Sequence, residues 1–224
     1  MHDAASHVVV LQGSWLDGAE ATIMGRRLSE RHRFDTRQLN YRTARASLKQ
    51  NVQRLREFVE HELRPHASAS CHFVGHSLGG LIILQMLADC HDAPSGRVVL
   101  LGTPLSDSNA AERLASLTSG RSMLGSSIAS GDAIDCGRML SACVDRRDVG
   151  MIAGTMSVGQ GERIADLPRP NDGSVTTEET SHERLTDHLR LAATHTTLVT
   201  SREVIDQVAG FLKHGRFDRA RHRR

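Results

Sequence analysis

The 224-residue sequence has no internal repeat and no apolar stretch long enough to span a bilayer. It also lacks a charge imbalance, because 28 lysines and arginines face 26 acidic residues, so charge gives no argument for nucleic acid as a partner. The first residues, MHDAASHVVVLQG, have neither the basic region nor the small-residue cleavage site of a signal peptide. We therefore expect a protein that is neither secreted nor inserted in a membrane.

The four cysteines form no CxxC pair, and no histidine lies at zinc-finger spacing from any of them. Cys71 and Cys90 fall within apolar segments, where cysteine usually behaves as a small hydrophobic residue. The sequence therefore predicts four reduced thiols and a cytoplasmic location. No metal ion and no cofactor is expected.

The composition, with 39% hydrophobic and 24% charged residues, is typical of a soluble globular chain. A chain of this length buries enough apolar surface to fold as one unit without disulfides. We expect a single domain over residues 1–224.

Short apolar runs alternate with segments of helical periodicity along the chain. The predicted strands lie at 7–13, 37–41, 71–75, 97–104, 149–155 and 188–193. The predicted helices lie at 18–33, 47–63, 79–91 and 201–213. Strands that alternate with helices indicate an α/β fold with a parallel sheet and helices on both faces. In such sheets the reactive loops follow the carboxyl ends of the strands.

Residues 105–148 interrupt this alternation, because glycine and serine separate short helical stretches at 108–118, 122–129 and 133–141. We interpret 105–148 as a small helical cap inserted in the domain. Its apolar side chains have two possible roles that the sequence leaves open, lining an acyl pocket or packing the cap onto the sheet. These side chains are Leu114, Leu117, Met123, Leu124, Ile128, Ile134, Met139 and Leu140.

The segment GHSLG at 75–79 matches the pattern G-x-S-x-G and lies between a predicted strand and a predicted helix. At this position Ser77 would occupy a strained turn that lifts its hydroxyl out of the sheet. Gly75 and Gly79 lack the side chains that would collide in so tight a turn. We predict that Ser77 is a nucleophile.

An oxyanion that forms beside Ser77 needs two N–H donors. The backbone amide of Leu78 begins the following helix and is the first predicted donor. The second should come from the loop after the first strand, where the amide of Ser14 is predicted, with Trp15 as the alternative.

A serine hydroxyl becomes a good nucleophile only when a base takes its proton. His195 lies just after the last predicted strand and before the last helix, and it is the predicted base. His182 and His188 lie before or within that strand and are weaker candidates. His76 adjoins Ser77, but its side chain is expected to point away from it.

The third residue must be a carboxylate that orients the base and stabilises its charged form. Asp172 follows the fifth strand in the segment NDGSV and is the predicted acid, although Asn-Asp-Gly is also a common turn sequence. Ser77, Asp172 and His195 then occur in the chain order typical of hydrolases with this motif. The alternative carboxylates are Asp148, Asp166 and Asp187.

These segments together resemble the α/β-hydrolase superfamily, and more narrowly its small bacterial lipase/esterase-like members with a GHSLGG motif. The resemblance covers nearly the whole chain and rests on VVVLQGSW, FVGHSLGG, RVVLLGTP, PNDGSVTTEET and HTTLVTSREVIDQVAGFLKHGRF. It implies a minimal α/β-hydrolase fold of about six strands with a short helical cap. It also implies Asp172 as the acid and His195 as the base. Many relatives carry His-Gly after the first strand, where this chain has Gln12 and Gly13.

The predicted function is hydrolysis of carboxylic esters through an acyl-enzyme on Ser77. The predicted partner is a small-molecule acyl ester. Aromatic residues make up only 3% of the chain, and Trp15 is its single tryptophan, so it is poorly suited to sit on a lipid surface. Two alternatives stay open: a thioesterase, amidase or acyltransferase with the same three residues, and a non-catalytic binding protein of the same fold.

Overall fold

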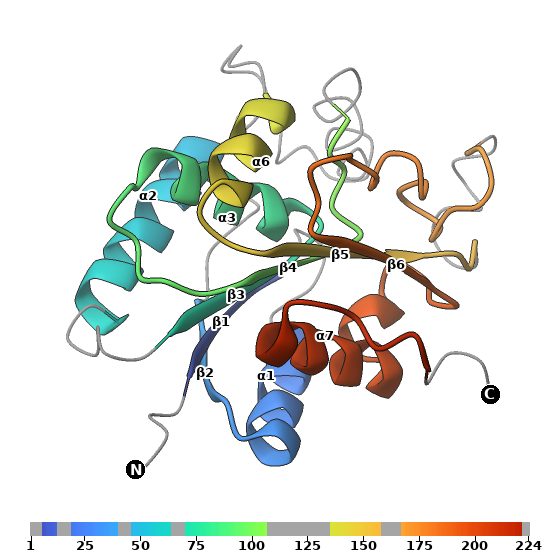
Figure 1. The fold of residues 1–224 in the computed structure, drawn as a ribbon, viewed down its shortest axis with the longest axis horizontal. Coiled ribbons are helices and arrows are strands. Elements are labelled where there is room, and N and C mark those ends of the chain that lie inside the picture. Colours follow the sequence, from blue (N-terminus) through green and yellow to red (C-terminus); the bar gives the residue numbers. More distant parts are fainter. Residues whose placement is uncertain are drawn as a thin grey trace.

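The computed structural model describes residues 6–12, 19–39, 46–63, 70–106, 135–157 and 167–220. Its centre is a six-stranded sheet, parallel throughout, in the order β2-β1-β3-β4-β5-β6 (Figure 1). The strands are β1 (His7–Leu11), β2 (Asp35–Gln38), β3 (Cys71–His76), β4 (Val98–Leu101), β5 (Val149–Gly154) and β6 (Asp187–Leu191). Every residue of β3, β4 and β5 is buried, because helices cover the sheet on both faces.

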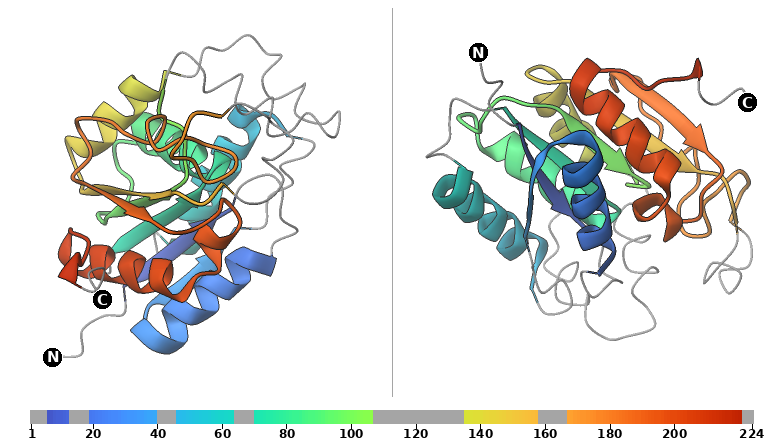
Figure 2. Two further views of the ribbon diagram at one scale, coloured as in Figure 1. Left: turned by 90° about the vertical axis from the view of Figure 1, so that its right-hand side faces the viewer. Right: turned by 90° about the horizontal axis from the view of Figure 1, so that it is seen from below.

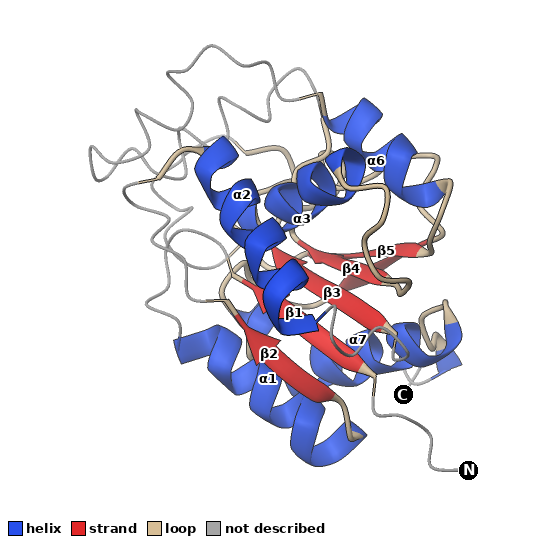
Figure 3. Cartoon of the chain, turned by 90° about the vertical axis from the view of Figure 1, so that its left-hand side faces the viewer, coloured by secondary structure: helices blue, strands red, loops and turns tan. Residues whose placement is uncertain are grey.

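The helices form one layer on each side of the sheet (Figure 3). One layer contains α2 (Leu48–Phe58) with the π-helical turn η1 (Val59–Leu63), α3 (Leu78–Asp89) and α6 (Cys136–Val144). The other contains α1 (Ala19–His32), the short 3-10 helix η4 (Thr197–Val199) and α7 (Arg202–His214). In this second layer α1 and α7 lie side by side (Figure 2).

The strand residues alternate between the two layers, as the pleat of a strand requires. In β1, Val9 and Leu11 join the core beneath α2, α3 and α6, whereas Val8 and Val10 join the core beneath α1 and α7. Helix α3 is nearly all apolar, and ten of its residues are buried because it lies between β3, α2 and α6.

The fold class predicted from the sequence is confirmed, and each predicted strand and helix outside the segment 105–148 is present. The boundaries differ by a few residues. The second strand begins at Asp35 rather than at residue 37, and the predicted helix 47–63 is an α-helix that ends in a π-helical turn. None of the helices in the described segments is long and apolar enough to cross a bilayer.

The end of the segment 105–148 belongs to the main body of the domain. Helix α6 packs against α3, and its apolar side chains enter the same core as those of α2 and α3. Met139 and Leu140 are completely buried there, so they pack the domain and do not line an open pocket. The other six apolar residues of the predicted cap lie outside the described residues. The cap therefore stays a prediction for residues 107–134.

Candidate active site

Ser77 lies in a sharp turn between β3 and α3. Its backbone has φ 53° and ψ −123°, and only one other non-glycine residue in the described part of the chain has a positive φ. Three hydrogen bonds hold this conformation: the Ser77 amide donates to Leu101 O at 2.9 Å, and its carbonyl accepts from Gly80 N at 3.0 Å and Thr103 Oγ1 at 3.1 Å. Backbone strain that is fixed in this way is typical of functional positions.

Glycines allow this turn to pack closely. A Cβ on Gly75 would lie 2.5 Å from the Cα of Gly80, and a Cβ on Gly79 would lie 2.6 Å from the carbonyl oxygen of Leu11. The first approach packs the end of β3 against α3, and the second brings the end of β1 next to the first turn of α3. The loop that follows β1 therefore begins beside the amide end of the helix that Leu78 opens.

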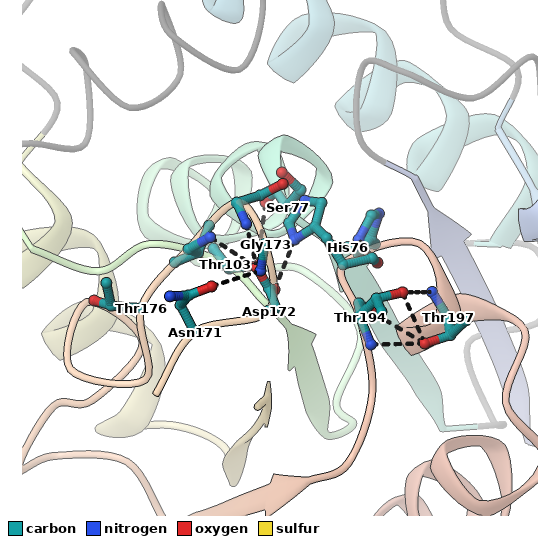
Figure 4. A network of polar contacts seen from close by, with 12 residues as sticks. His76, Ser77, Thr103, Asn171, Asp172, Gly173, Thr176, Thr194 and Thr197 are labelled. Carbon is teal, nitrogen blue, oxygen red and sulfur yellow. Dashed lines mark hydrogen bonds and ion pairs between the residues drawn. The ribbon is translucent and has the colours of Figure 1, made fainter. Parts of the chain in front are cut away.

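Asp172 and His195 form a buried hydrogen-bonded pair (Asp172 is labelled in Figure 4). The distance from Asp172 Oδ2 to His195 Nδ1 is 2.7 Å, and the His195 amide donates to Asp172 O at 2.8 Å. The second carboxylate oxygen of Asp172 accepts from the amides of Ser174 and Val175 at 2.9 and 2.7 Å. Asp172 is 1% exposed and His195 is 8% exposed. Each oxygen of the buried carboxylate therefore has a donor, as a buried charge requires.

The contact with Asp172 also decides which nitrogen of His195 is available. Because a carboxylate accepts only, the proton of the neutral ring is assigned to Nδ1, and Nε2 carries the lone pair. That Nε2 is buried and has no hydrogen-bond partner among the described residues. The ring is thus set to accept a proton through Nε2, the arrangement that a general base requires.

Hydrogen bonds within two turns hold the loops that carry Asp172 and His195. In the loop that carries Asp172, Asn171 donates to the carbonyls of Leu167 and Pro168 and accepts from Gly173 N. In the loop that carries His195, Thr194 and Thr197 exchange hydrogen bonds, and each hydroxyl accepts from the other residue's amide at 2.7 and 3.2 Å (Figure 4). Sequence reasoning did not identify these residues. The spacing Thr-His-Thr-Thr is the one available signal for the second turn.

His76 contacts His195 rather than solvent. Its Nε2 lies 3.0 Å from the carbonyl oxygen of His195, and the two rings are 4.5 Å apart between centroids. Burial, and then the electrostatic effect of the neighbouring His195, hold the pKa of His76 well below its usual value. The sequence predicted that this side chain points away from Ser77.

The weaker candidates lie in other surroundings. His188 faces Thr180 Oγ1 at 3.2 Å, and burial lowers its pKa. Asp148 pairs with Arg97, and Asp187 pairs with Arg219. These two carboxylates lie at the amino ends of β5 and β6, at the opposite edge of the sheet from Ser77. Sites predicted at Ser14, Trp15 and Asp166 lie outside the described residues.

No metal centre is evident in the described segments, where no three histidine, cysteine, aspartate or glutamate side chains are grouped to bind an ion. Ser77, Asp172 and His195 all follow strands of the sheet, at its carboxyl edge.

Known protein structures share this arrangement of strands and helices. The mature form of a Bacillus licheniformis lipase aligns with a TM-score of 0.64 and 18% identity over 94% of this chain and 91% of that one. A metagenomic carboxyl esterase aligns with a TM-score of 0.62 and 20% identity over 86% and 65% of the two chains. A lipase-esterase related protein of Clostridium acetobutylicum gives 0.55 and 12% over 93% of each. No family model and no curated protein sequence matches the chain.

At these identities the likeness concerns the fold. The chain has the α/β-hydrolase fold, in a minimal version with six parallel strands.

Proposed function

We propose that the protein is a serine hydrolase that cleaves soluble carboxylic esters through a covalent acyl-enzyme. The observation that carries the proposal is the buried 2.7 Å contact between Asp172 and His195, whose Nε2 has no hydrogen-bond partner in the described part of the chain. His195 also packs against the residue that precedes Ser77. The lipases and esterases among the structural neighbours support the same chemistry.

In the proposed reaction, the Ser77 hydroxyl attacks the acyl carbonyl while His195 Nε2 takes its proton. Asp172 stabilises the imidazolium that forms. The amides of Leu78 and Ser14 donate to the oxyanion. His195 then gives the proton to the leaving alkoxide, and an acyl-enzyme remains. Water attacks this ester, loses a proton to His195, and releases the acid with the Ser77 hydroxyl restored. These steps require neither a metal nor a cofactor.

The proposed substrate is a small ester dissolved in water. In the described part of the chain only two large apolar side chains are exposed, Ile23 at 37% and Met156 at 43%, so this part offers no broad apolar face for a lipid surface. We also propose a cytoplasmic location, which the four free and buried cysteines support. A single domain over residues 1–224, with a cap within 107–134, completes the proposal.

A series of p-nitrophenyl esters from acetate to palmitate tests the proposed function. A modest acyl pocket gains about 0.8 kcal/mol per buried methylene, which is roughly a fourfold rise in kcat/KM per carbon until the pocket is full. We expect kcat/KM to rise over a few carbons and then fall, with no increase in activity above the solubility limit of the substrate. Strong hydrolysis of emulsified long-chain triglyceride, with activation at the interface, would contradict this substrate assignment.

The variant Gly102→Ala is expected to lower kcat/KM for the best ester by about a hundredfold, because small misplacements of catalytic groups have effects of that order. Gly102 has φ 53°, and an added methyl group would lie 2.9 Å from Asp172 Oδ2 and 3.2 Å from His195 Nδ1. It would therefore separate the acid from the base. Steady-state kinetics on the folded variant measure the loss.

Gly210→Ala is the matched control for this substitution. Gly210 lies inside α7, and its added methyl group would have nothing within 4 Å. This variant should keep full activity and gain about 1 kcal/mol in the free energy of unfolding, since alanine favours helix over glycine. Full activity in Gly102→Ala would show that the contact between Asp172 and His195 is not needed.

A further inference from the structure

The carbonyl group of His195 has a side-chain partner that the reaction does not use. The ring of His76, which is 3% exposed, reaches it from the end of β3 across 119 positions of sequence. A carbonyl oxygen only accepts, so the His76 ring nitrogen at 3.0 Å is the donor. This contact assigns the His76 proton to Nε2. Its Nδ1 is then an acceptor, and it is buried without a hydrogen-bond partner in the segments described.

The unpartnered Nδ1 shows that this position does not satisfy both polar atoms of the His76 ring. A buried nitrogen without a partner costs free energy, and an apolar side chain of similar size would avoid that cost. Among the described residues, the one contact that the His76 ring makes through a polar atom is the bond to His195. In Figure 4, His76 lies beside Ser77 and on the same side as the base loop that carries Thr194 and Thr197.

We propose that His76 is a positioning residue. The hydrogen bond from His76 Nε2 to the His195 carbonyl holds His195 at a fixed position relative to Ser77. This inference rests on the proposed function, in which His195 is the base. Because His76 and Ser77 are adjacent, the nucleophile and the anchor of the base move as one unit. Asp172 fixes the amide and Nδ1 of His195, and His76 fixes its carbonyl, so the base is held from both sides.

The position of His76 also keeps its ring from taking up the proton that His195 accepts in the proposed reaction. Its ring packs against that of His195 with centroids 4.5 Å apart, where a positive charge would oppose formation of the His195 imidazolium. Burial keeps the pKa of His76 low, so the ring stays neutral while its Nε2 proton remains available to donate.

The variants His76→Gln and His76→Met separate the donor from the bulk of the side chain. The two replacements have nearly the same size and flexibility, but only glutamine carries an N–H donor. A third variant, His76→Phe, keeps an aromatic ring against His195 and removes the donor. The readouts are kcat and KM for the best p-nitrophenyl ester and the second-order rate of labelling by a fluorophosphonate, each per folded molecule.

His72 supplies the matched control on the same strand. It is also a buried histidine with a backbone partner, since its Nδ1 accepts from Arg97 N at 2.9 Å, and its ring also meets an aromatic side chain, that of Phe34. Burial and the charge of Arg97 lower its pKa to about 4. It lies at the amino end of β3, away from Ser77. His72→Gln and His72→Met should change stability and leave kcat, KM and the labelling rate at wild-type values.

We expect His76→Met and His76→Phe to lower kcat and the labelling rate by about a hundredfold with KM within about twofold of wild type, because substrate binding does not involve the ring. His76→Gln should recover most of this loss. Wild-type rates in the methionine variant would overturn the inference, and so would equal losses in the glutamine and methionine variants. Full activity in His76→Phe would assign the effect to ring packing instead.

The two hypotheses fail in different ways. A folded wild-type protein that does not react with the fluorophosphonate overturns the proposed function, whatever the variants do. A wild-type protein that labels at Ser77, together with unchanged rates in His76→Met, overturns only the positioning role. Should His76→Phe not fold, the comparison of glutamine with methionine still decides the question.

Discussion

Ser77→Ala is expected to lower kcat for ester hydrolysis by about a millionfold, the usual scale for loss of a nucleophile that acts in a unit with its base. The hydrogen bonds that hold the turn use the backbone amide and carbonyl of Ser77, and its side chain does not cap α3. Alanine keeps the Cβ and therefore the same strain at φ 53°. We expect the free energy of unfolding to stay within about 1 kcal/mol of wild type. Steady-state kinetics and urea unfolding measure both quantities.

Ser201→Ala is the control for this variant. Ser201 precedes α7 as Ser77 precedes α3, and its side chain likewise makes no capping hydrogen bond. It should retain wild-type activity. Substantial ester hydrolysis by Ser77→Ala, at a level that a trace of wild-type enzyme does not explain, would contradict the proposed reaction.

His195→Ala is expected to be as inactive as the serine variant, because Ser77 without a base is a poor nucleophile. The double variant Ser77→Ala with His195→Ala should be no worse than either single one, since residues that act as a unit do not contribute additively. By contrast, His182→Ala and His188→Ala should keep most of the activity. The rings of His182 and His188 bond to Arg184 N and to Thr180 Oγ1, and neither has a hydrogen bond to Asp172 among the described residues.

The kinetics of these four variants decide which histidine is the base. An inactive His188→Ala together with an active His195→Ala would overturn the assignment of the base. Additive effects would be equally informative, because a double variant far slower than both single variants would show that Ser77 and His195 act independently.

Local patterns in the sequence predicted the strands and the sharp turn at Ser77 because the contacts that determine them are themselves local. Buried strands such as β3 and β4 read as continuous apolar runs, and the close approach of Gly75 to Gly80 spans only five positions. Chain order was enough to select Asp172 and His195 for their positions after strands. The structure places them in direct contact.

Contacts between distant segments were not predictable in this way. Helix α6 was interpreted as part of a cap because glycine and serine precede it, yet its apolar face packs on α3 and makes it part of the helical layer. The bond from His76 to His195 joins two elements whose relative placement depends on the whole sheet. Nothing in the sequence around residue 76 distinguishes a histidine that positions His195 from an ordinary buried histidine.

Mass spectrometry of the intact protein after reaction with a fluorophosphonate tests whether Ser77 is the nucleophile. We expect one covalent adduct per wild-type molecule, mapped by peptide analysis to Ser77, and no adduct on Ser77→Ala or on His195→Ala within the same time. Folded wild-type protein that gains no adduct, or gains it at another residue, would show that Ser77 is not the nucleophile.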